Sequence, residues 1–96
     1  MMTGEQVLKI ASDELGIPKE VLLVQGLRRY LDSQLHEVQA NIFQITGQYG
    51  IKDAADMESQ YRTGEIEEAT SWRDAQRLDH LEYKRERLLR LLASLS

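Results

Sequence analysis

Two histidines, His36 and His80, are the side chains of this sequence best suited to acid–base chemistry or metal binding near neutral pH. Neither has a second histidine four residues away, and the zinc-protease pattern H-E-x-x-H is absent. Without that ligand geometry, both histidines are interpreted as surface or boundary residues. We therefore assign no metal site and no catalytic histidine.

Carboxylates gather in the middle of the chain, at Asp53, Asp56, Glu58, Glu65, Glu67 and Glu68. Carboxylate oxygens suit hard cations, but this spacing does not match a calcium-binding loop. One interpretation is a solvated acidic loop. The other is a docking surface for a basic partner, because opposite charges steer two proteins together.

Aromatic residues flank the second half of this acidic stretch, with Tyr61 before it and Trp72 after it. Such side chains either fix a turn to the core or anchor a partner as interface hot spots. The hypothetical partner-binding site therefore comprises Tyr61, Glu65, Glu67, Glu68 and Trp72.

Sequence motifs for nucleotide binding and nucleophilic catalysis are missing. There is no G-x-G-x-x-G, no G-x-x-x-x-G-K-[ST] and no G-x-S-x-G pattern. The chain has no cysteine, which removes thiolate chemistry, disulfides and zinc–sulfur sites. We expect no enzymatic activity and no cofactor.

The charge balance favours protein partners over nucleic acid. Lys and Arg number 12 and Asp and Glu 16, so the formal net charge is −4, whereas nucleic-acid binders need surplus positive charge to neutralise phosphates. Residues 51–70 carry 2 basic and 6 acidic side chains, and residues 71–96 carry 6 and 4. Acidic side chains interleave the basic ones in this last segment, which is typical of a salt-bridged helix face.

Helical periodicity runs through the whole sequence, without a strand pattern. We expect helices at Glu5–Leu15, at Pro18–Tyr49, at residues 54–62 after an Asp53 cap, and at Trp72–Leu95 after a Ser71 cap. Ser71 with Asp74 is a weaker form of the capping box. Gly16 and Pro18 predict a tight corner between the first two helices. Residues 63–71 are predicted to form a loop.

Two seams of apolar residues follow the two long helices. On the second helix, one row of the seam comprises Val24, Leu31, Val38 and Ile45, and the other comprises Leu35, Ile42 and Tyr49. On the last helix, one row comprises Leu78 and Leu92, and the other comprises Leu81, Leu88 and Leu95. Residues 1–96 are thus predicted to form a single all-α domain. Its centre is a long antiparallel helical hairpin, coiled-coil-like, with a short N-terminal helix and a short helix at the hairpin tip. Pairing of the heptads across a homodimer is an alternative.

The segment Glu14–Gln34, ELGIPKEVLLVQGLRRYLDSQ, resembles the paired helices of ribbon–helix–helix antitoxins. The resemblance covers residues 5–34 and implies a corner at Gly16 and a buried face at Leu23, Leu27 and Leu31. That family reads DNA with a strand before its first helix, where this sequence has only Met1–Gly4. No DNA-reading residue is therefore carried over. Residues 61–88 are similar in style to small prokaryotic antitoxin-like proteins.

Together these features predict a non-enzymatic protein–protein interaction module, antitoxin-like, whose partner is a small basic protein. The alternatives are a nucleic-acid-associated regulator that uses the basic C-terminal helix and a structural coiled-coil dimerisation module. The longest apolar stretch, Val21–Val24, is far too short for a membrane span, and no signal peptide is visible. We expect a cytoplasmic protein.

Overall fold

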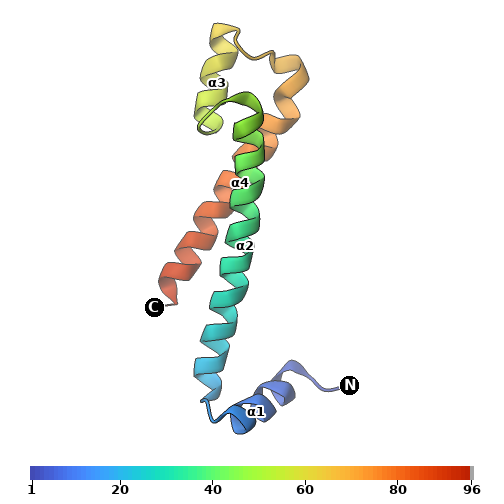
Figure 1. The fold of residues 1–96 in the computed structure, drawn as a ribbon, viewed down its shortest axis with the longest axis vertical. Helices are drawn as coiled ribbons and strands as arrows, with labels where there is room; N and C mark the ends of the chain where they lie inside the picture. The colour runs from blue at the N-terminus through green and yellow to red at the C-terminus, as the bar shows by residue number, and fades with distance from the viewer. Residues whose placement is uncertain (96) are drawn as a thin grey trace.

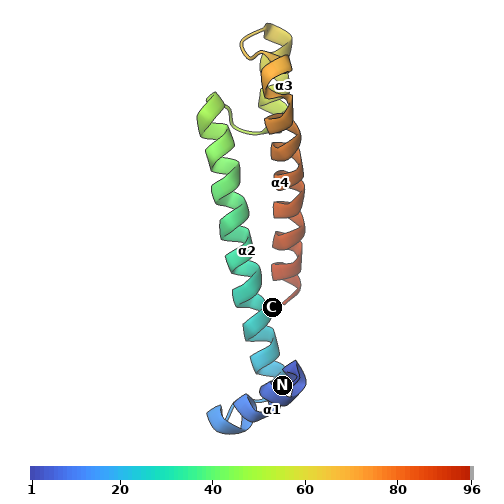
Figure 2. The same ribbon diagram turned by 90° about the vertical axis from the view of Figure 1, so that its right-hand side faces the viewer.

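Four helices make up the part of the chain that the computed structural model describes, residues 1–95. They are α1 (Gly4–Leu15), α2 (Lys19–Tyr49), α3 (Ala54–Thr63) and α4 (Glu68–Ser94). α2 and α4 pack side by side in opposite directions, with α3 at the tip and α1 at the other end (Figures 1 and 2). The predicted all-α hairpin is confirmed, and residues 1–95 contain no strand. None of the helices in this range has the length and apolarity to cross a membrane.

The core of the hairpin is formed by the two predicted seams. Its buried residues are Val38, Ile42 and Ile45 of α2, Leu78, Leu81 and Leu88 of α4, and Ile51 and Met57 near the tip. Leu31, Leu35 and Tyr49 are half-buried against this cluster. Each fully buried aliphatic side chain contributes about 1.5–3 kcal/mol relative to exposure, so the seams supply the main attraction between α2 and α4.

The corner between α1 and α2 forms as the sequence predicts. Gly16 adopts the left-handed conformation (φ 65°) and its amide donates to the Ser12 carbonyl, which ends α1. Pro18 is the residue before α2, which begins one residue later than expected, at Lys19. α1 also has a capping box that sequence analysis missed. The Thr3 hydroxyl accepts from the Gln6 amide, and the Gln6 side chain accepts from the Thr3 amide.

The tip helix α3 is fixed to α4 at its first turn. Asp53 caps α3 as predicted, because its carboxylate accepts from the Asp56 amide at 2.8 Å. Glu82 of α4 reaches the same turn and accepts from the Ala54 amide, also at 2.8 Å. These two carboxylates satisfy amides at the positive end of the helix dipole. Met57 then buries its whole side chain in the core.

The start of α4 differs from the prediction. The helix begins at Glu68, with Glu67 as its N-cap residue, and only residues 64–67 remain as the connection from α3. Ser71 is therefore not a cap. It is buried inside the helix, and its hydroxyl donates to the Glu67 carbonyl one turn earlier at 2.7 Å. Asp74, predicted to complete the capping box, instead accepts a hydrogen bond from the Tyr49 phenol.

The molecule is a rod, with extents of 61 × 30 × 16 Å and a radius of gyration of 19.6 Å. A compact chain of this length has a radius of gyration of about 12.5 Å. α2 is longer than α4, and Arg28, the tenth residue of α2, donates to the Leu95 carbonyl at the end of α4, at 3.0 Å. Residues 19–27 of α2, with α1, therefore project beyond the hairpin (Figure 2). We call α1 with residues 19–27 the N-terminal end.

Candidate functional site

The predicted partner-binding residues all lie at the tip of the hairpin. Tyr61 belongs to α3, Glu65 and Glu67 lie in the connection, and Glu68 and Trp72 belong to the first two turns of α4. This connection is at the top of Figure 1. The three glutamates are exposed. The fold therefore brings the five positions to one end of the molecule, although they do not all face solvent.

Tyr61 is a structural residue of the tip. Its ring is half-buried against the core, and its hydroxyl lies 2.8 Å from the Ser71 hydroxyl. The Ser71 hydroxyl has one proton, which it donates to the Glu67 carbonyl, so the Tyr61 phenol must be the donor to Ser71. This chain of two hydrogen bonds ties the end of α3 to the start of α4. For Tyr61, the interpretation as a core residue is correct.

Trp72 has the opposite environment. Its side chain is 46% exposed, and the Arg73 guanidinium lies 5.5 Å from the ring centroid, at cation–π distance. The interpretation in which Trp72 fixes the turn to the core is therefore wrong. Glu68 lies four residues before Trp72 and so shares its face of α4. We call the exposed surface of Glu65, Glu67, Glu68 and Trp72 the acidic tip.

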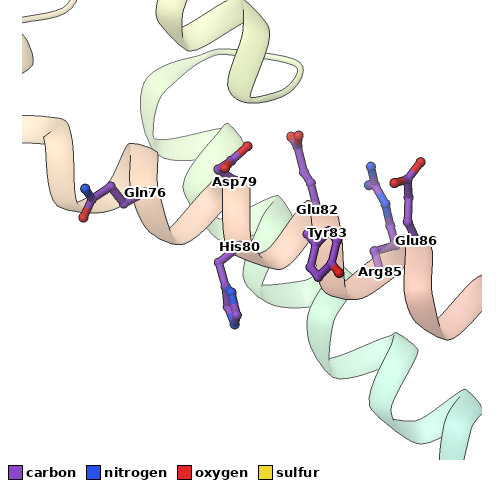
Figure 3. Close-up of a pocket in the computed structure, with 7 residues that line it drawn as sticks. All are labelled: Gln76, Asp79, His80, Glu82, Tyr83, Arg85 and Glu86. Atoms are coloured by element: carbon purple, nitrogen blue, oxygen red, sulfur yellow. The ribbon is translucent and has the colours of Figure 1, made fainter.

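A hollow of about 550 Å³ lies along α4, and Figure 3 shows the side chains that line it. All its lining residues come from this one helix: Gln76, Asp79, His80, Glu82, Tyr83, Arg85 and Glu86. His80 points away from the side on which Asp79 and Glu82 project (Figure 3). Glu82 is already engaged by the Ala54 amide. Within residues 1–95, no group of three or more His, Asp and Glu side chains could hold a metal ion.

The phenol of Tyr49 has a clearly shifted pKa. The phenol of Tyr49 donates to the Asp74 carboxylate, which joins the last turn of α2 to α4. This hydrogen bond, together with burial and the negative charge of Asp74, raises the pKa of Tyr49 to about 12. A phenol that stays protonated beside a carboxylate strengthens the hairpin and offers no base for catalysis near neutral pH.

The N-terminal end carries a surface that the predicted site did not include. Its exposed large apolar side chains are Val7, Ile10 and Leu15 of α1 and Val21, Leu23 and Leu27 of α2. Leu23 and Leu27 are 55% and 45% exposed, so the buried face implied for them by the antitoxin resemblance is wrong within this chain. Leu31, the third residue of that face, is half-buried against the core.

A shallow groove of about 440 Å³ lies between α1 and α2 at the N-terminal end. Leu8 and Leu23 line it together with charged residues of both signs. The sequence signal for this surface is the unbroken apolar run Val21–Val24, which is too short for a membrane and too wide for one helical seam.

A family model described as "Uncharacterized protein MJ0235 family" matches residues 1–96. The search of curated proteins and the search of solved structures gave no match.

Proposed function

We propose that this chain, which belongs to the Uncharacterized protein MJ0235 family, is a non-enzymatic protein-binding module. The observation that carries the proposal is the exposed apolar surface of the N-terminal end. Six large aliphatic side chains stand open to solvent there, on two adjacent helices. An exposed apolar patch of this kind is typical of a protein–protein interface.

The energetic argument for a protein partner is the area involved. Burial of apolar surface contributes about 25 cal/mol per Å², so covering such side chains gives a partner substantial binding energy. All residues of α1 (Gly4–Leu15) are exposed or half-buried, so the fold of the isolated chain gains little from this helix. A partner that covers the N-terminal end would supply the missing burial.

A second candidate surface is the acidic tip, with a small basic protein as its partner and an antitoxin-like role. The exposed Trp72 beside Glu68 favours it, because tryptophan is enriched among interface hot spots and negative charge complements a basic partner. Residues 51–70 carry a net charge of −4, which would steer a basic partner towards this end of the rod.

Association with nucleic acid is less well supported. The basic side chains of α4 alternate with acidic ones, and two of its arginines lie against aromatic rings. Arg73 covers Trp72, and Arg87 lies 5.7 Å from the ring centroid of Tyr83. Strongly salt-dependent binding to a labelled DNA or RNA duplex would favour this alternative over a protein partner.

Affinity capture from the native host, with three forms of the protein as bait, tests the proposal. The baits are the wild type, Leu23→Glu/Leu27→Glu at the N-terminal end and Glu65→Lys/Glu67→Lys/Glu68→Lys at the acidic tip. We expect the wild type to retain a partner that one of the two variants loses. The protein-binding function is wrong if both variants retain the same proteins as the wild type.

A further inference from the structure

We propose that the partner of the N-terminal end is a second copy of this chain, so that two rods join end to end in a symmetric homodimer. The proposal rests on the protein-binding function proposed above and names its partner. Three features of the structure carry it: the surplus surface of the isolated chain, the distribution of apolar side chains around α2, and the distribution of charge along the rod.

The surplus surface is large enough for a stable dimer. The chain exposes 7390 Å², whereas a monomeric protein of 11.1 kDa exposes about 5,700 Å². The surplus is about 1,700 Å² per chain, and a standard protein–protein interface needs only about 800 Å² from each partner. The elongated chain therefore exposes more surface than an interface of standard size would bury, and the exposed apolar side chains locate where that interface lies.

Apolar side chains surround the first turns of α2. At 100° per residue, the five apolar residues Val21, Leu22, Leu23, Val24 and Leu27 point in directions spread around most of the helix. α1 packs against α2 here, and Leu22 and Val24 are half-buried. Val21, Leu23 and Leu27 remain exposed. A helix that is apolar on most sides is typically buried on most sides, which a single neighbouring helix cannot achieve.

The charge distribution selects a second copy and its orientation. In a two-fold interface the same patch meets itself, so charges of both signs within the patch can pair across the two-fold axis. The N-terminal end as a whole carries 2 basic and 4 acidic side chains. The groove within it is lined by Lys9, Lys19, Glu5 and Glu20, whose charges balance. Residues 51–70 carry a net charge of −4, so two acidic tips repel each other. Two copies therefore meet at their N-terminal ends, with the acidic tips far apart.

Such a dimer has a simple packing solution. Two copies of α1 and two copies of the first turns of α2 form a four-helix unit around the exposed leucines. The two hairpins then extend from this unit, each closed at its base by the Arg28 side chain on the Leu95 carbonyl. The acidic tips stay free to bind another protein.

Sedimentation equilibrium of the full-length chain tests the proposal, at concentrations up to about 100 µM, where a micromolar dimer is mostly associated. We expect the wild type to have about 22 kDa, twice the 11.1 kDa of one chain. Leu23→Glu/Leu27→Glu should sediment as a monomer, and so should Ile10→Glu on α1. Helix content by circular dichroism should be unchanged, because the replaced side chains are largely exposed.

The matched control is Phe43→Glu, an equivalent change on the same helix. Phe43 is 76% exposed and lies 16 residues beyond Leu27, outside the N-terminal end. We expect this variant to remain a dimer. The proposal is wrong if the wild type is a monomer at the highest concentration. It is also wrong if Phe43→Glu dissociates the dimer while the N-terminal variants do not.

The same experiment separates this proposal from the protein-binding function. If the wild type is a monomer and Leu23→Glu/Leu27→Glu still loses a captured partner, the N-terminal end binds a different protein. In that case self-association is wrong and the protein-binding function stands.

Discussion

At the scale of single residues, Tyr49 and Asp74 form a hydrogen bond between α2 and α4 at the tip end of the hairpin core. The phenol stabilises the fold only while it is protonated, because it donates the hydrogen bond to the carboxylate. Its pKa is about 12 in the folded chain and near 10 when unfolded. The stabilisation is therefore complete below pH 10 and is lost as the pH rises towards 12.

The first prediction concerns this pH dependence. Between pH 10 and 12, the free energy of unfolding of the wild type should fall more steeply than that of Tyr49→Phe, which has no phenol at this position. Urea denaturation at several pH values measures the difference. In a spectrophotometric titration, Asp74→Asn should lower the pKa of Tyr49 towards 10. Equal slopes for wild type and Tyr49→Phe would refute the role of this hydrogen bond.

The second prediction concerns Ser71, which receives one hydrogen bond and donates another inside the tip. Ser71→Ala leaves the half-buried Tyr61 phenol without its acceptor, and an unsatisfied polar group costs about 1–3 kcal/mol. We expect the free energy of unfolding to fall by about 1–2 kcal/mol in urea denaturation, because water can reach part of the phenol.

Ser94 provides a matched control for Ser71. Its hydroxyl makes the same type of bond, to the Arg90 carbonyl one turn earlier, but at an exposed position. Ser94→Ala should change the free energy of unfolding by less than about 0.5 kcal/mol, as is usual for surface sites. If the two substitutions have equal effects, the Tyr61–Ser71 contact does not stabilise the tip.

At the scale of secondary-structure elements, the helical core was predictable from sequence, and the start of α4 was not. The seven-residue spacing of residues such as Val38, Ile45, Leu81 and Leu88 places them on one face of each helix, and the structure buries them there. Ser71 misled the prediction, because a serine can cap a helix or bond back to a carbonyl inside one. Its contact with Tyr61 decides between the two, and sequence alone does not show that contact.

The candidate surfaces were only partly predictable for a similar reason. Tyr61 and Trp72 flank the same acidic stretch, yet one packs on the core and the other faces solvent. The difference follows from the earlier start of α4, which turns Ser71 inwards and leaves its neighbour Trp72 outside. The exposure of Leu23 and Leu27 depends on how far α4 extends along α2, and the heptad pattern of α2 contains no information about that length.

The third prediction compares two neighbouring leucines on α4. Leu88 is 7% exposed and belongs to the core, whereas Leu89 is 47% exposed on the outside of the hairpin. Leu88→Ala should lower the free energy of unfolding by about 2–5 kcal/mol, because it removes buried methyl groups and leaves a cavity. Leu89→Ala should have an effect below about 0.5 kcal/mol. Denaturant titration of both variants measures the difference. If Leu88→Ala lowers the free energy of unfolding less than Leu89→Ala does, the face of α4 assigned to the core is wrong.

At the scale of the whole molecule, the chain is a rod with chemically different ends. The tip carries a net charge of −4 and one exposed tryptophan, whereas the N-terminal end exposes six large aliphatic side chains. The two surfaces lie at opposite ends of a rod that is 61 Å long in total. The N-terminal end and the acidic tip are therefore far enough apart for each to bind a partner without contact between the two partners.

The last prediction concerns the overall shape in solution, which small-angle X-ray scattering measures. A dimer joined at the N-terminal ends separates its two centres of mass along the long axis, so its radius of gyration should be well above the 19.6 Å of one chain. A dimer of rods packed side by side would stay close to that value, because its long axis would not grow. Leu23→Glu/Leu27→Glu should return the radius of gyration to near 19.6 Å, and Phe43→Glu should leave the larger value unchanged. A wild-type dimer near 19.6 Å would contradict end-to-end assembly and indicate that the hairpins themselves form the interface.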